Sequence, residues 1–220
     1  MTGRSALLVG GTGLVGRELA RAIAEGPDYR ELHALVRRPD AALAALPKVV
    51  LHVVDFEALG PVPAVDDTYI ALGTTIKQAG SQAAFRRVDY DHVVNVARAA
   101  RAAGAQRLAV VSALGADARA RVFYNRVKGE MEAAVSELGY ASVVIAQPSL
   151  LVGDRGALQQ PVRPGEVWAE RLMNPVKWLI PANFRPILAR DVARSLIAAT
   201  LVAAPGTRVL ASRELRSAAH

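Results

Sequence analysis

The chain has 220 residues, of which 52% are hydrophobic and 21% are charged. This length suits a single domain with its own core, and the composition excludes a disordered chain. It also excludes a membrane-spanning protein, because no apolar run approaches the roughly 18 residues that a span requires. The absence of cysteine excludes a disulfide scaffold, a thiolate metal site and a cysteine nucleophile. Because the N-terminal stretch does not fit a secretory signal peptide, we expect a cytoplasmic protein whose redox chemistry would need a bound cofactor.

The formal net charge is +7, from 27 basic and 20 acidic residues. Most of the basic residues are arginines scattered singly or in pairs among alanines, and no block of five or six like charges occurs. This pattern is typical of solvated helix faces, so we expect neither nucleic acid nor a membrane as partner. The chain has only four lysines, namely Lys48, Lys77, Lys128 and Lys177, so a lysine inside a motif is informative.

Short apolar runs alternate with longer helical patterns, which predicts an α/β fold of the Rossmann type, with a doubly wound parallel sheet and crossover helices. We expect one domain over residues 1–220. The predicted strands cover residues 6–9, 32–36, 49–54, 68–72, 107–111, 142–146 and 208–211. The predicted helices cover residues 13–25, 82–103, 124–138 and 192–202, the last with Asp191 as its N-cap.

The segment 153–186 does not follow this alternation of strand and helix patterns. It contains five prolines and both tryptophans, around a short apolar helix pattern near residues 167–180. Because it follows the sixth strand, it either covers the carboxyl ends of the sheet as a small substrate-side insertion or forms an irregular packing loop.

A glycine-rich turn follows the first predicted strand and contains Gly10, Gly11, Thr12, Gly13, Leu14, Val15 and Gly16. In such a turn Gly10 permits the sharp bend, Gly13 lets the backbone approach a pyrophosphate, and Gly16 allows close packing between helix and strand. The helix that follows presents amide donors at its N-terminus. At the first strand-to-helix junction of an alternating chain, this pattern predicts dinucleotide binding.

The end of the second predicted strand indicates which dinucleotide is bound. An acidic residue there would accept hydrogen bonds from the adenosine ribose, but this strand ends in Arg37 and Arg38. Guanidinium groups pair with phosphate, which favours NADP(H) over NAD(H), although a basic surface turn would look the same. Asp55, at the end of the third strand, would either bind the adenine amino group or cap the following turn.

Three residues carry the candidate chemistry. Ser112 closes the fifth predicted strand, and Tyr124 and Lys128 lie four residues apart at the start of the next helix, on one face. An ammonium group near a tyrosine hydroxyl favours the ionised phenol and makes it a usable proton donor or acceptor. The alternative is an ordinary surface pair, but the glycine turn and Ser112 favour a catalytic group.

Several further motifs accompany these residues along the chain: Leu72-Gly73-Thr74-Thr75, Phe85-Arg86-Arg87-Val88-Asp89, Gly115-Ala116-Asp117, Val127-Lys128-Gly129-Glu130, Gly153-Asp154-Arg155 and Arg163-Pro164-Gly165-Glu166. Together they resemble the atypical short-chain dehydrogenase/reductase superfamily, and within it the Tat-interacting-protein-like oxidoreductases and their bacterial relatives. The resemblance implies that Tyr124 is the general acid/base, that Lys128 binds the nicotinamide ribose and lowers the tyrosine pKa, and that Ser112 orients a carbonyl. It also assigns a set of residues to cofactor binding: Thr12, Leu14, Val15, Leu72, Gly73 and Pro148.

Two positions depart from the pattern of that superfamily. Asp89 stands where many relatives place an asparagine that holds a relay water, and Gln147-Pro148 stands where Arg-Pro is common. The four histidines are dispersed along the sequence, so we expect no metal site. Two functions remain: an NADPH-dependent reductase of a small carbonyl or related substrate, and an NADP(H)-dependent sensor that a protein partner reads.

Overall fold

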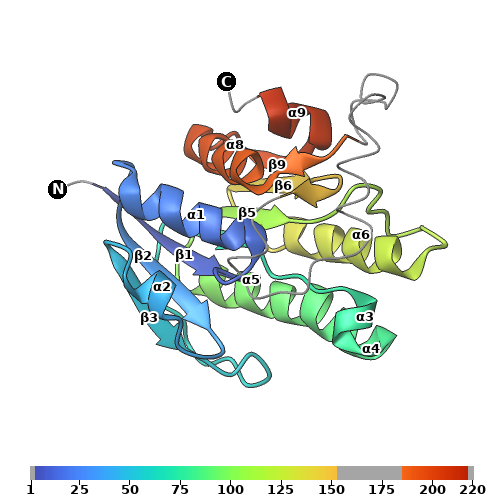
Figure 1. The fold of residues 1–220 in the computed structure, drawn as a ribbon, viewed down its shortest axis with the longest axis horizontal. Helices are drawn as coiled ribbons and strands as arrows, with labels where there is room; N and C mark the ends of the chain where they lie inside the picture. Colours follow the sequence, from blue (N-terminus) through green and yellow to red (C-terminus); the bar gives the residue numbers. More distant parts are fainter. Residues whose placement is uncertain (1–2, 153–184, 218–220) are drawn as a thin grey trace.

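The computed structural model describes residues 3–152 and 185–217 (Figure 1). Seven strands form one wholly parallel sheet, in the order β3-β2-β1-β4-β5-β6-β9. Their bounds are β1 Arg4–Val9, β2 Tyr29–Val36, β3 Val49–Val53, β4 Asp67–Ile70, β5 Arg107–Val111, β6 Ser142–Gln147 and β9 Gly206–Ala211. The predicted doubly wound Rossmann-type fold is confirmed.

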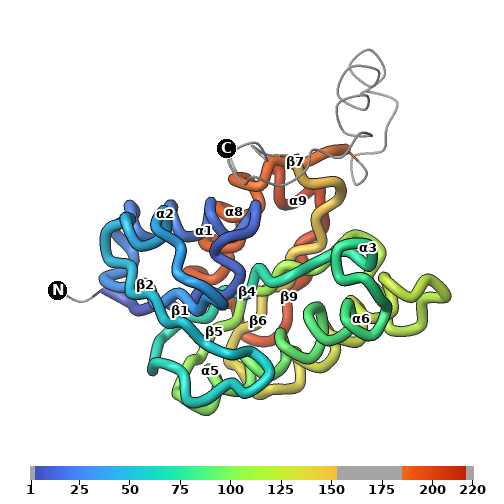
Figure 2. The backbone as a smooth tube through the Cα atoms, turned by 60° about the horizontal axis from the view of Figure 1, so that its bottom comes forward, coloured from blue at the N-terminus to red at the C-terminus, as the bar shows by residue number. Residues whose placement is uncertain are grey.

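Helices cover both faces of the sheet, as Figure 2 shows. On one face lie α1 (Leu14–Glu25) and α8 (Ala189–Val202), and on the other α5 (Val93–Ala102) and α6 (Phe123–Ser136). The side chains of β1 alternate between the two core layers and are buried on both sides, as expected for a central parallel strand. A C-terminal helix, α9 (Ser212–Ser217), packs against α8.

The helix predicted over residues 82–103 is present but is not uniform. It consists of α4 (Gln82–Arg86), a π-helical segment η1 (Arg87–His92) and α5. The predicted apolar face already contained an irregular step, because Val88 and Val93 are five residues apart, which fits the i→i+5 spacing of a π turn. Two further short helices, α2 (Ala41–Ala44) and α3 (Ile76–Ala79), lie in the loops after β2 and β4.

The prediction of Asp191 as an N-cap is wrong. Helix α8 begins at Ala189, after Leu188 in extended conformation, and Asp191 lies within the first turn. There its carboxylate is 3.7 Å from the Arg190 guanidinium, and an acidic side chain still favours the positive end of the helix dipole.

The segment that the sequence singles out, 153–186, begins and ends at a small second sheet. Strands β7 (Leu151–Val152) and β8 (Ile187–Leu188) pair in parallel at its two ends. The helix pattern near residues 167–180 and the motifs at 153–155 and 163–166 lie outside the described residues.

The strand order reverses between β1 and β4, which are neighbours in the sheet although β2 and β3 lie between them in the chain. At such a switch point the loops after the two strands diverge to opposite faces and leave a crevice at the carboxyl ends. The fold therefore places the glycine turn after β1 beside the loop after β4.

Candidate functional site: a nucleotide cavity beside a buried aspartate-lysine pair

A cavity of about 730 Å³ lies at this switch point. Seven of the predicted cofactor-binding residues line it: Gly10, Thr12, Gly13, Arg37, Arg38, Leu72 and Gly73. Sequence reasoning missed other residues of its wall, among them Asp40, Phe56, Thr74, Gln78, Val88 and His92. Val88 and His92 are four residues apart in the helix predicted over residues 82–103. This spacing places both on one helix face, which could have identified them as part of one cavity wall.

The glycine turn is tightly constrained at two of its three positions. Gly10 has a φ of +85°, and a Cβ atom there would lie 2.5 Å from the backbone of Ala71 on the neighbouring loop. A Cβ atom at Gly16 would lie 2.0 Å from the Gly10 carbonyl oxygen. At Gly13 the nearest atom would be the Gly10 carbonyl oxygen at 3.3 Å, a tight contact that a shift of a few tenths of an ångström would relieve.

Helix α1 begins directly after this turn and suits an anion. Gly13 is its N-cap, no side chain caps it, and its first turn contains no acidic residue. The first amide groups of the helix therefore keep their hydrogen-bonding capacity for a ligand in the cavity.

Arg37 and Arg38 are exposed on the cavity wall at the end of β2. An acidic residue does lie close by, because Asp40 also lines the cavity. Both oxygens of its carboxylate are engaged: Oδ1 accepts a hydrogen bond from the Leu43 amide at 2.9 Å, which caps α2, and Oδ2 lies 3.4 Å from the Arg17 guanidinium. The local charge around the two arginines therefore remains positive.

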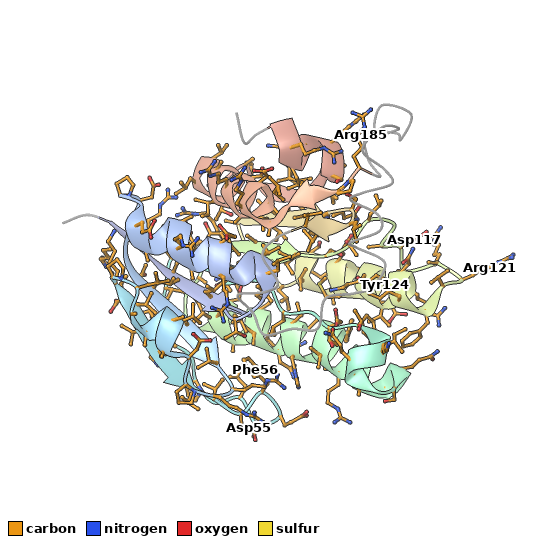
Figure 3. All side chains as sticks on the ribbon, in the orientation of Figure 1. Asp55, Phe56, Asp117, Arg121, Tyr124 and Arg185 are labelled. Atoms are coloured by element: carbon orange, nitrogen blue, oxygen red, sulfur yellow. The ribbon has the colours of Figure 1, made fainter. Side chains whose placement is uncertain are left out.

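The loop after β3 contributes Phe56 rather than Asp55 to the cavity. Phe56 is buried and its ring centre lies 5.7 Å from that of His92, so together they form an aromatic wall. Asp55 is exposed, and its carboxylate accepts a hydrogen bond from the Glu57 amide at 2.9 Å, which is the turn-capping role. Figure 3 shows Asp55 and Phe56 at the periphery of the molecule, apart from Tyr124.

Tyr124 and Lys128 lie one turn apart in the first half of α6. The ring of Tyr124 packs against that of Phe85, with ring centres 5.2 Å apart, and Phe85 is fully buried in α4. Tyr124 itself is half-buried, whereas Lys128 is only 4% exposed. Within the described residues, neither residue belongs to the lining of the 730 Å³ cavity.

Lys128 is paired with Asp89 of η1. The Lys128 Nζ atom lies 2.7 Å from Asp89 Oδ1, and the Thr74 amide donates a hydrogen bond of 2.9 Å to Asp89 Oδ2. Burial raises the pKa of the Asp89 carboxyl above its ordinary value, against the opposing effect of Lys128 and the Thr74 amide. A Cβ atom at Gly73, on the cavity wall, would lie 3.4 Å from Asp89 Oδ1 and 3.8 Å from Lys128 Nζ. The pair therefore lies directly behind this wall.

Ser112 follows β5, where its amide bonds to the Ala146 carbonyl oxygen, and its hydroxyl is buried towards α6. The neighbouring carboxylate is Glu132, which accepts hydrogen bonds of 3.0 Å from the Gln147 amide group at both oxygens. Burial raises the pKa of Glu132, while the Ser112 hydroxyl, Gln147 and Lys128 act in the opposite direction. The Ser112 hydroxyl thus faces the protein interior and not the cavity.

Leu14, Val15, Gly16 and Pro148, also predicted to bind the cofactor, are not among the described residues that line the cavity. Leu14 and Val15 pack into the core layer on the α1 side, and Gly16 lies under the glycine turn. Pro148 is buried, and its carbonyl oxygen accepts a hydrogen bond from the Leu114 amide at 3.0 Å.

The described residues contain no group of three or more His, Asp or Glu side chains placed to hold a metal ion. Over residues 3–152 and 185–217, no helix is both long and apolar enough to cross a membrane.

Comparison with known proteins supports a nicotinamide cofactor. The sequence profile of a family described as NAD(P)H-binding matches residues 10–151. The chain is 36% identical over 152 residues to the protein FMP52, mitochondrial, of Eremothecium gossypii, which covers 69% of this chain and 68% of that protein. It is 31% identical over 201 residues to FMP52 of Candida albicans, with 88% and 86% covered.

Solved structures share the fold at low sequence identity. One is MoeE5 in complex with UDP-glucose and NAD, with a TM-score of 0.69, 15% identity, and 97% of this chain and 80% of that chain covered. Another is the Helicobacter pylori ADP-L-glycero-D-manno-heptose-6-epimerase, with a TM-score of 0.70, 15% identity, and 95% and 77% covered.

The expectation of a cytoplasmic location is wrong in the light of these relatives, whose names place them in mitochondria. The expectation rested on the poor fit to a secretory signal peptide and on the lack of an apolar run long enough to span a membrane. Neither feature distinguishes the cytosol from the interior of an organelle.

Proposed function

The chain belongs to the NAD(P)H-binding family, and from that premise we propose that it is an NADP(H)-dependent oxidoreductase acting on a small carbonyl or related substrate. We place it in the atypical short-chain dehydrogenase/reductase superfamily, in the Tat-interacting-protein-like branch that its motifs resemble. The observation that carries the proposal is the switch-point cavity, with a glycine turn on one wall and two arginines on another.

The charge of the cavity supports NADP(H) as the cofactor. The pyrophosphate would lie over Gly13 at the N-terminus of α1, and Arg37 and Arg38 would bind the 2′-phosphate of the adenosine ribose. Asp40 does not oppose this, since its carboxylate caps α2 and pairs with Arg17. Phe56 and His92 would flank the adenine.

Tyr124 and Lys128 would carry out the proton transfer and hold the ribose. The bound cofactor would supply the hydride, and the Tyr124 hydroxyl would deliver the proton to the substrate oxygen. Lys128 would donate hydrogen bonds to the hydroxyls of the nicotinamide ribose, and its positive charge would favour the ionised form of Tyr124.

A second function, an NADP(H)-dependent sensor with little turnover, is favoured by one observation. The Ser112 hydroxyl, expected to orient a substrate carbonyl, is buried against Glu132. Unless that hydroxyl turns towards the cleft, the chain lacks the expected donor to the carbonyl, and binding of the cofactor alone would then be the functional event.

The experiment is a turnover screen with NADPH against aldehydes, ketones and quinones, followed by NADPH absorbance. With a substrate in hand, Tyr124→Phe should bind NADPH nearly as tightly as the native protein but lose turnover by roughly a hundredfold to ten-thousandfold. Lys128→Ala should lose both affinity and rate.

The control is Tyr90→Phe, since this ring packs under the Arg86 guanidinium and its hydroxyl has no assigned role in the chemistry. It should retain native turnover. A Tyr124→Phe variant that turns over at the native rate would show that the proton donor has been misassigned. If no substrate is reduced while NADPH binds and alters association with a protein partner, the sensor function replaces the reductase.

A further inference from the structure

Three elements converge on Lys128 from different parts of the chain. Helix α6 carries the lysine, η1 carries Asp89, and the loop after β4 supplies the Thr74 amide that fixes the second oxygen of Asp89. Asp89 is 0% exposed, so its carboxylate has no solvent to stabilise it and relies on these two donors.

The pair leaves Lys128 with spare donors in a defined place. An ammonium group has three N–H donors, and the contact with Asp89 at 2.7 Å uses one of them. The remaining two would lie close to the wall formed by Gly73, whose Cβ position is 3.8 Å from the Nζ atom. A diol such as the ribose 2′- and 3′-hydroxyls offers two acceptors to such a group.

We propose that Asp89 is the positioning residue of the cofactor site, which holds the Lys128 ammonium in place and charged for the nicotinamide ribose. The inference rests on the proposed function, because it assumes that NADP(H) occupies the cavity. It assigns Asp89 a direct ionic role at the position where related proteins place an asparagine that holds a relay water.

Stability alone does not account for such a pair. A buried ion pair loses so much hydration that apolar residues of similar volume often serve a core as well or better. The neighbouring helix α4 already packs against α6 through Phe85, which contacts Phe123 and Tyr124, and through the Arg86-Glu130 ion pair. The π-helical turn directs Asp89 inward, and π turns are frequent at functional sites.

The charges around Lys128 determine what happens when Asp89 is neutralised. Asp89 faces it from η1, Glu132 interacts with it from the next turn of α6, and Tyr124 precedes it by one turn. In Asp89→Asn the side chain keeps its volume and an acceptor for the Thr74 amide, but the buried ammonium loses its nearest counter-ion. The Lys128 side chain is then no longer held beside the wall formed by Gly73, so its hydrogen bonds to a ribose hydroxyl weaken.

The test compares two ligands by calorimetric titration of native protein and Asp89→Asn. NADPH would contact the whole site, whereas 2′,5′-ADP lacks the nicotinamide mononucleotide, including one of the two bridging phosphates, and reports only the adenosine half. We expect Asp89→Asn to bind NADPH roughly tenfold or more weakly at pH 8, the loss of one charge-assisted hydrogen bond, and to bind 2′,5′-ADP as the native protein does.

The matched control is Asp91→Asn, which removes an exposed carboxylate from the same π-helical segment and should leave both affinities unchanged. Equal NADPH affinity in native protein and Asp89→Asn would overturn the inference, and so would a parallel loss of 2′,5′-ADP binding, which indicates a general structural role. If the native protein binds neither ligand, the proposed function fails and the inference with it. Asp89→Glu, which restores the charge at a slightly longer reach, should recover NADPH affinity relative to Asp89→Asn.

Discussion

The glycines of the turn after β1 have separable roles at the scale of single residues. Gly16 is required by the fold, since any Cβ atom there would overlap the Gly10 carbonyl oxygen, whereas a Cβ atom at Gly13 would need a shift of only a few tenths of an ångström. We predict that Gly13→Val abolishes NADPH binding with little loss of stability, and that Gly16→Ala destabilises the protein by roughly 1–3 kcal/mol. Urea unfolding and NADPH titration of the two variants check this. Normal NADPH binding by Gly13→Val would show that the turn does not hold the pyrophosphate.

The position of a residue was predictable from the sequence where it follows from one strand or turn. It was not predictable where it depends on contacts with several other elements. The glycine spacing and the Arg37-Arg38 pair predicted the cavity walls, because their positions follow from the strand ends alone. The environment of Ser112 was not predictable, since it depends on Glu132 of α6, whose carboxylate is held in turn by Gln147 of β6. Asp89 looked like a departure from a pattern until its contact with Lys128 was visible.

At the scale of elements, the Asp66 carboxylate connects the residue before β4 to the start of β1 by hydrogen bonds. Asp66 accepts hydrogen bonds from the Ser5 amide at 2.7 Å and the Ser5 hydroxyl at 3.0 Å. The Ser5 amide lowers the pKa of Asp66 below its ordinary value. The ionised Asp66 carboxylate therefore stabilises the folded protein at pH values above the ordinary pKa of an aspartate. This stabilisation is lost as the pH falls through the lowered pKa that Asp66 has in the folded state.

We predict that Asp66→Ala loses about 1–2 kcal/mol of unfolding free energy at pH 7, and that its difference from the native protein shrinks below about pH 4. Urea unfolding of native protein and Asp66→Ala at pH 7 and at about pH 3 measures this difference in unfolding free energy. Asp28→Ala, which removes an exposed carboxylate near the same end of the sheet, should change stability by less than about 0.5 kcal/mol. A difference between native protein and Asp66→Ala that does not change between pH 7 and pH 3 would contradict this role.

Element types were predictable where hydrophobic periodicity is regular. The seven strands and the helices α1, α6 and α8 follow patterns with period two or 3.6, or continuous apolar runs, and the structure differs from the predictions mainly at their ends. The π-helical segment is the exception, because the five-residue step from Val88 to Val93 reads as an imperfect α-helix unless a wider turn is considered. Strands β7 and β8 are only two residues long, too short for any periodicity to appear.

At the scale of the whole molecule, strand order links the sequence to the site. The alternating pattern predicted parallel strands, and the crossover from β3 to β4 places the switch-point cavity between the glycine turn and the loop after β4. All described residues that line it come from the N-terminal half of the chain, while Lys128 lies behind the Gly73 wall on α6, from the C-terminal half. The cofactor would therefore bridge the two halves of the sheet.

The central claim is that this cavity recognises the 2′-phosphate of NADP(H). Calorimetric titration of the native protein should give an affinity for NADPH at least roughly tenfold higher than for NADH, as one bidentate guanidinium-phosphate contact provides. The double variant Arg37→Ala, Arg38→Ala should lose most of this preference and keep its NADH affinity. A control that removes two remote exposed arginines, Arg30→Ala with Arg98→Ala, should keep the preference. Equal affinities of the native protein for NADPH and NADH would contradict the account and leave Arg37 and Arg38 as ordinary surface charges.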